Sequence, residues 1–172
     1  KCRTTADLDG CGGSRFGAFL ADTWALSLTP GSESWGSAAL TTAGTAPTGR
    51  WGHAGVFDAV NNRMVTFGGR VATGYTDAVY ELTLGGTPTW SQVSVTGTPG
   101  VRYFMTYGYD AVNNGLVIQS GYQTTSIVAD MWYLPLSGGS VHVWNQLPAD
   151  ATASIGRVTG SATLDPARQQ LL

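Results

Sequence analysis

The chain has 172 residues, of which 42% are hydrophobic and only 12% are charged, and its formal net charge is -2 at pH 7. Its nine basic residues are scattered, which excludes an electrostatic interface for nucleic acid or for an anionic membrane. No stretch approaches the roughly 20 apolar residues of a membrane-spanning helix. The 24 glycines and six tryptophans instead favour a β protein with many turns.

The first segment contains both cysteines of the chain, Cys2 and Cys11. Their spacing is compatible with a disulfide, and also with two buried or free thiols. By analogy with secreted proteins we expect the bridge, and together with the single lysine it favours an extracellular or periplasmic location. Residues 7–10 (DLDG) resemble the start of a calcium-binding loop, but its remaining ligands are missing, so we expect no calcium site.

An internal repeat follows and indicates the architecture. The sequence DAVNN begins at Asp58 and again at Asp110, a shift of 52 residues, and Arg50 and Arg102 keep the same shift. A third copy of these markers lies 55 residues further on. Tryptophans recur with a similar period, at Trp35, Trp90 and Trp144.

Each unit contains four short runs that alternate apolar with small or polar residues, which is typical of strands. In the unit that begins at Gly49 they cover residues 53–60, 63–69, 78–84 and 89–95. The link Asn61-Asn62, and Gly115 after Asn114 in the next unit, are expected to supply the positive φ of the first hairpin turn. The repeated aspartates are expected to accept backbone hydrogen bonds in these turns. No window has a sustained helical period, so we predict essentially no helix.

The order of Arg50, His53, Gly68-Gly69, Tyr80 and Trp90 resembles the kelch repeat, the four-stranded blade of a β-propeller. The next unit departs from that pattern, with Met105 in place of the histidine and Ser120-Gly121 in place of the double glycine. The resemblance implies an all-β fold: a partial kelch-type β-propeller of four-stranded antiparallel blades, open unless more chain or association completes it. It also implies that the repeated tryptophans and tyrosines are apolar wedges between blades.

We divide the chain into an N-terminal partial blade (1–48, strands two to four), a blade at 49–96, a blade at 97–150 and the start of a further blade at 151–172. Because a closed propeller typically needs four to eight blades, we expect a piece of a longer propeller. The alternatives are association of two or more copies and an open array capped by another protein.

The recurring arginines Arg50, Arg102 and Arg157 stand where one blade passes to the next. The resemblance implies that they lie near the mouth of the central channel, where a guanidinium can hold a carboxylate through two hydrogen bonds. The alternative is that each arginine bonds backbone carbonyls between blades. Trp51 and Tyr103 follow two of these arginines and are candidates to stack on a sugar or peptide, unless they point into the sheet.

We predict no catalytic residue, no metal site and no cofactor. His53 and His142 are the only histidines, they lie in different strand types, and neither has a companion at metal-ligand spacing. The sequence lacks the GxSxG motif of a nucleophilic serine and a phosphate-binding glycine loop.

The leading interpretation is a non-catalytic binding or assembly module, secreted or surface-exposed, that recognises a protein or glycan or builds an extracellular structure. The alternative is part of a kelch-propeller enzyme, such as a galactose-oxidase-like copper oxidase or a sugar mutarotase. The copper oxidase needs a ligand set that this chain does not offer, unless further blades supply it.

Overall fold

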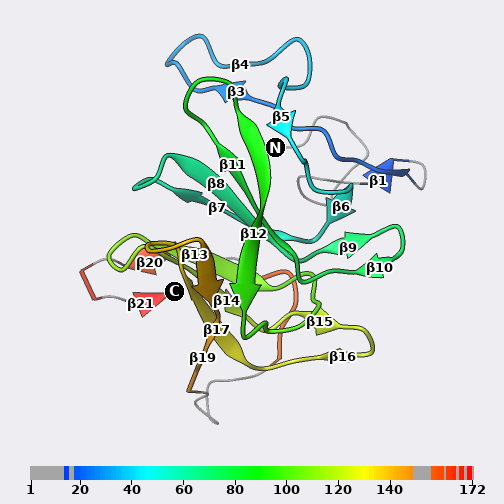
Figure 1. Cartoon of the computed structure of the whole chain (residues 1–172), viewed down its shortest axis with the longest axis vertical. Helices are drawn as coiled ribbons and strands as arrows, with labels where there is room; N and C mark the ends of the chain where they lie inside the picture. The colour runs from blue at the N-terminus through cyan, green and yellow to red at the C-terminus, as the bar shows by residue number, and fades with distance from the viewer. Residues whose placement is uncertain are drawn as a thin grey trace.

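The computed structural model describes residues 14–15, 18–148, 156–160, 162–165, 167–168 and 170–171. Within these ranges the chain forms short β-strands and no helix, which confirms the all-β fold class (Figure 1). It follows that no helix of the described part could cross a membrane. Cys2, Cys11 and the DLDG segment lie outside the described residues.

The second blade is a four-stranded antiparallel sheet in the order β7-β8-β11-β12. Its strands are β7 (Ala54–Asp58), β8 (Arg63–Phe67), β11 (Val79–Thr83) and β12 (Thr89–Thr96). The first three fall within the runs predicted from alternation, and β12 extends one residue beyond its predicted run. Short turns join β7 to β8 and β11 to β12, while the longer segment 68–78 joins β8 to β11. The four strands therefore follow one another in the sheet in chain order.

The third blade repeats this arrangement, with the order β13-β14-β17-β19. Its strands are β13 (Thr106–Asp110), β14 (Gly115–Gln119), β17 (Met131–Pro135) and β19 (Asn145–Leu147). A further hairpin follows, formed by β20 (Leu164–Asp165) and β21 (Gln170–Leu171). It corresponds to the first two strands of the preceding blades.

Short strands before the second blade form two separate pairs. β1 (Ser14–Arg15) pairs with β2 (Ala18–Phe19), and β3 (Leu26–Ser27) pairs with β4 (Ser34–Trp35). β5 (Ala43–Gly44) continues from there and runs parallel to the start of β12. β18 (Val141–Val143) runs parallel to the end of β12. β12, the outermost strand of the second blade, therefore also pairs with one strand that precedes the blade in the sequence and with one that follows it.

Small hairpins extend from the inner ends of the blades and lie on the right of the view in Figure 1. β6 (Arg50–Trp51), β9 (Arg70–Val71) and β10 (Gly74–Tyr75) form one three-stranded sheet. β15 (Tyr122–Gln123) and β16 (Ser126–Ile127) form the equivalent hairpin of the third blade. In the third blade an isolated bridge between Tyr103 and Tyr122 stands at the position where β6 pairs with β9 in the second blade.

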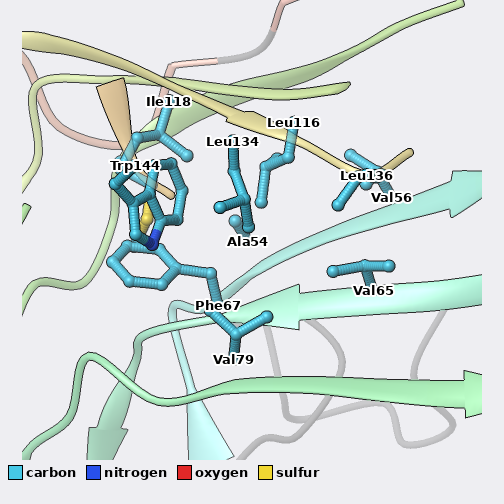
Figure 2. Packing of buried hydrophobic residues seen from close by; sticks show 11 residues of the cluster. Ala54, Val56, Val65, Phe67, Val79, Leu116, Ile118, Leu134, Leu136 and Trp144 are labelled. Carbon is cyan, nitrogen blue, oxygen red and sulfur yellow. The ribbon is translucent and has the colours of Figure 1, made fainter. Parts of the chain in front are cut away.

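The hydrophobic core lies between the second and third blades (Figure 2). The rings of Phe67 and Trp144 pack with their centroids 4.8 Å apart, and both side chains are buried. Burying each such side chain contributes about 2 to 3 kcal/mol. The predicted role of the repeated tryptophan as a wedge between blades is thus confirmed at Trp144.

The aspartates of the turns act as predicted. At Asp58, Asp110 and Asp165 the carboxylate accepts the backbone N–H groups two and three residues further on, at 3.0 to 3.2 Å. Asn62 has the expected positive φ of 49°.

The expectation for Gly115 is wrong, because Asn114 takes the positive φ, at 51°. Gly115 is needed for space instead. A Cβ atom at this position would collide with the ring of Tyr133.

The double glycine at the end of β8 has a mechanical role. Gly68 and Gly69 have φ values of 72° and 104°, and a Cβ on Gly68 would lie 2.6 Å from the carbonyl oxygen of Arg102. At the same position of the third blade Ser120 adopts φ 57°, and its buried hydroxyl has no hydrogen-bond partner. A serine therefore carries backbone strain where the kelch pattern has glycine.

We predict that Ser120→Gly stabilises the protein by about 1 kcal/mol, because it relieves the left-handed strain and removes an unpaired buried hydroxyl. Gly68→Ser should destabilise it by at least as much. Thermal unfolding followed by circular dichroism would measure both midpoints. A fall in the midpoint of Ser120→Gly would contradict this account of the position.

Candidate functional site

Arg102 is fully buried within its own blade. Its guanidinium donates to the carbonyl oxygen of Ser120 at 3.1 Å, to that of Pro99, and to both carboxylate oxygens of Asp130 at 2.8 and 3.1 Å. The Trp132 indole N–H also donates to Asp130, at 2.7 Å. Burial alone would raise the pKa of Asp130, but the hydrogen bonds from Arg102 and Trp132 hold that pKa below its ordinary value.

Arg50 occupies the equivalent position with a different partner set. It is buried, and it donates to the carbonyl oxygens of Gly68 at 2.9 Å and Thr48 at 3.1 Å. The second blade has no carboxylate matching Asp130, and the guanidinium instead lies 5.1 Å from the centroid of the Tyr80 ring.

Arg50 bonds one carbonyl of its own blade, that of Gly68, and one at the end of the preceding partial blade, that of Thr48. Both carbonyls bonded by Arg102 belong to its own blade. The contacts favour the structural alternative for Arg50 and Arg102. Arg157 differs from both, because its side chain is exposed.

Trp51 and Tyr103, the two aromatic candidates, lie in contact. Their ring centroids are 5.3 Å apart and their planes are nearly perpendicular, at 89°. Tyr103 also stacks on Tyr75 at 5.0 Å and lies 5.4 Å from Tyr122. Phe104 packs on Trp51 at 5.1 Å and on Tyr103 at 5.0 Å. These five rings, all half-buried, form one continuous cluster on the inner hairpins of two blades.

The exposed side chain of Arg70 completes this cluster. Its guanidinium carbon lies 5.5 Å from the centroid of the Trp51 ring and 5.9 Å from that of Tyr75. Among the described residues no carboxylate forms an ion pair with it. We call the group of Arg70, Trp51, Tyr75, Tyr103, Phe104 and Tyr122 the aromatic surface.

Phe104 is held in an unusual backbone conformation. Its φ of 56° is left-handed, which costs a bulky residue about 1 to 2 kcal/mol. Its N–H donates to the Gly52 carbonyl at 2.7 Å, and its own carbonyl accepts the Thr159 N–H at 2.9 Å. Gly52 and Thr159 are also left-handed, at 66° and 59°, so the conformation repeats from blade to blade. Of the three equivalent positions, only the one in the third blade has a bulky aromatic side chain.

Two titratable groups at or near these residues, Tyr103 and His53, are neutral at neutral pH. Burial and the neighbouring Tyr75 raise the pKa of Tyr103, so its hydroxyl keeps its proton. Burial, and then the positive charge of Arg50, lower the pKa of His53 to about 4. The Nδ1 atom of His53 is buried without a hydrogen-bond partner, which indicates a packed side chain. His142 is buried on β18.

The described residues contain no group of three or more His, Cys, Asp or Glu side chains that could hold a metal ion. The six side chains of the aromatic surface offer stacking, hydrogen-bond donation and one cation.

Sequence reasoning missed Arg70, Tyr75, Phe104 and Tyr122. A signal was present for two of them, since Arg70 and Tyr122 each follow the glycine that ends a blade's second strand, with the repeat's shift of 52 residues. Applying the shift to every aromatic residue would have grouped Tyr122 with Arg70 and Tyr103 with Trp51. It would not have shown that the inner hairpins of two blades meet.

Comparison with known proteins identifies relatives at the level of fold. The family model described as the KLHDC2/KLHL20/DRC7 Kelch-repeats domain matches residues 10–170. The solved structure of YjhT matches with a TM-score of 0.58 at 20% sequence identity, over 82% of this chain and 42% of that one. The chain thus spans less than half the length of this structural neighbour. No curated protein sequence matches.

We expect Asp130→Ala to destabilise the protein by about 3 kcal/mol, because it leaves the Arg102 guanidinium buried without its counter-charge. Urea denaturation would measure the loss. The control is Arg168→Ala, which removes an ion pair to Asp165 whose arginine is 73% exposed, and should leave the midpoint near wild type. Equal midpoints for Asp130→Ala and wild type would contradict the importance of this pair.

The lowered pKa of His53 predicts a pH dependence. The unfolded chain binds the proton near the ordinary pKa of 6.5 and the folded chain only near 4, so stability should fall as the pH drops between these values and stay level above them. The loss at pH 4.5 should be about 2 kcal/mol. Chemical denaturation at pH 4.5 and pH 7 would measure the free energy of unfolding at both values, and His53→Gln should lose much less of it than wild type. If both proteins lose the same free energy of unfolding, His53 is not the source of the pH dependence.

Proposed function

Because the chain belongs to the family of the KLHDC2/KLHL20/DRC7 Kelch-repeats domain, we propose that it is a non-catalytic recognition module whose binding face is the aromatic surface. The proximity of five half-buried rings and one exposed arginine carries this proposal. Tryptophan, tyrosine and arginine are the residues that most often dominate binding energy at protein interfaces. Rigid aromatic side chains also lose little conformational entropy on binding.

The strain at Phe104 supports the same face. Strained backbone is retained where the surrounding structure requires it, and such positions cluster at functional sites. The blade position of Phe104 holds glycine in the second blade, which can adopt this conformation without strain. A phenylalanine there gains contacts with Trp51 and Tyr103, at a cost to stability.

The proposal extends to the setting of the module. A kelch propeller of four to eight blades needs more blades than the described residues supply, and we infer that further blades or other copies of the chain complete it. The low charge and the cysteine pair of the N-terminal segment favour an extracellular or periplasmic setting. Light scattering in solution, compared with the mass of the intact chain, would show whether copies associate.

Binding selection would test the function. Peptides selected from a random phage-displayed library, and ligands from a glycan array, should bind the wild type and lose at least about tenfold in affinity for Tyr75→Ala plus Tyr122→Ala. The control is Phe57→Ala, whose ring is 48% exposed on β7 outside the aromatic surface, and which should bind as wild type does. If neither selection yields a ligand that depends on Tyr75 and Tyr122, the proposed function fails.

A further inference from the structure

The aromatic surface is rich in hydrogen-bond donors and poor in acceptors. Arg70 offers guanidinium N–H groups, Trp51 offers an indole N–H, and the three tyrosines offer hydroxyls. Its acceptors are the phenolic oxygens, because the six side chains include no carboxylate and no amide.

This donor pattern distinguishes between classes of ligand. A sugar presents many hydroxyl groups, each of which must donate a hydrogen bond as well as accept one when it is buried. A surface without carboxylates or amides leaves most of these donors unpaired. A ligand that presents carbonyl oxygens and apolar surface, but few N–H groups, fits the surface better.

A proline-rich segment has these properties. Proline has no backbone N–H, and in the polyproline II conformation the backbone carbonyls are not used internally. The pyrrolidine rings supply apolar surface, and surfaces lined by aromatic side chains are the usual partners of such segments. The segment is already extended before binding, so it loses little conformational entropy.

The geometry of the rings is suited to packing against prolines. Trp51 and Tyr103 are nearly perpendicular, and Tyr103 and Tyr122 are inclined by 64°. Phe104, held between Trp51 and Tyr103 by its left-handed backbone, adds a further apolar ring to the same cluster.

Charge adds a requirement on the ligand. Arg70 is exposed and is held above the rings of Trp51 and Tyr75 without a carboxylate partner among the described residues. A guanidinium in this position would pair with an acidic side chain next to the proline-rich stretch.

We propose that the ligand of the aromatic surface is a proline-rich protein segment flanked by an acidic residue, with the prolines on the rings and the carboxylate on Arg70. This inference rests on the proposed function and names the ligand class for the same site. Phe104 is then a specificity-determining residue, because its ring contributes contact area that the glycine of the second blade cannot supply.

Synthetic peptides would test the inference by fluorescence anisotropy. The probes are labelled peptides of ten consecutive prolines flanked by aspartates, the same peptide flanked by lysines, and a glycine-serine peptide of equal length flanked by aspartates. We expect the first to bind at least about tenfold more tightly than the other two. Arg70→Ala should remove the preference for aspartate over lysine, and Tyr75→Ala should weaken the aspartate-flanked peptide about tenfold or more.

Phe104→Gly separates a binding role from a structural one. It should weaken the proline peptide at least about fivefold while raising the thermal midpoint, because the left-handed strain is relieved. Phe57→Ala should bind the peptide as wild type does. A lowered midpoint together with unchanged binding would show that Phe104 only supports the fold and would overturn its assigned role.

The outcomes separate this inference from the proposed function. If the proline peptides bind no better than the glycine-serine peptide, the ligand class is wrong. Should the phage or glycan selections still yield ligands that depend on Tyr75 and Tyr122, the recognition role remains and only the ligand class is overturned. If both sets of probes fail to bind, the recognition role is wrong as well.

Discussion

The packing of one blade's sheet against the next positions everything else in the described chain. Phe67 and Trp144 meet between the second and third blades, and the aliphatic side chains around them are buried as well. A single four-stranded sheet has two faces and cannot cover either by itself, so a neighbouring blade is a condition of its stability. The distance between two blades also determines whether Trp51 of one can touch Tyr103 of the next.

The arginines at the blade junctions illustrate how a repeated residue can have the chemistry of a binding site without its exposure. The guanidinium of Arg102 is not available to a ligand, because it already donates hydrogen bonds to Asp130 and to two backbone carbonyls. In the second blade the guanidinium of Arg50 donates to the carbonyls of Gly68 and Thr48 and lies over the ring of Tyr80. The arginine at this position therefore keeps its structural role in both blades, while its partners differ with the local sequence.

Much of the fold could be predicted from sequence, because periodicity records local structure. The recurrence of DAVNN placed Asp58 and Asp110 in equivalent turns, and alternation placed the four strands of the second blade. What failed depended on contacts distant in sequence. Gly115 was expected to have a positive φ, whereas the ring of Tyr133 is the reason for glycine there.

The candidate site was predicted less completely for the same reason. Trp51 and Tyr103 were singled out by their place after the arginines, but their meeting with Tyr75 and Arg70 depends on how small hairpins of two blades approach each other. A repeat shows which residues are equivalent, and it contains no information on which of them come into contact across a blade boundary. The domain limits, the location and the disulfide remain predictions.

The residues of the aromatic surface stand mostly on strands of two residues, outside the four-stranded sheets that hold the core. Substitutions in β9, β10, β15 and β16 therefore change what the surface presents without altering the packing of Phe67 against Trp144. Such a division lets the specificity of the surface diverge between related proteins while the scaffold is conserved. It also makes these hairpins the natural place to graft a new recognition sequence onto the fold.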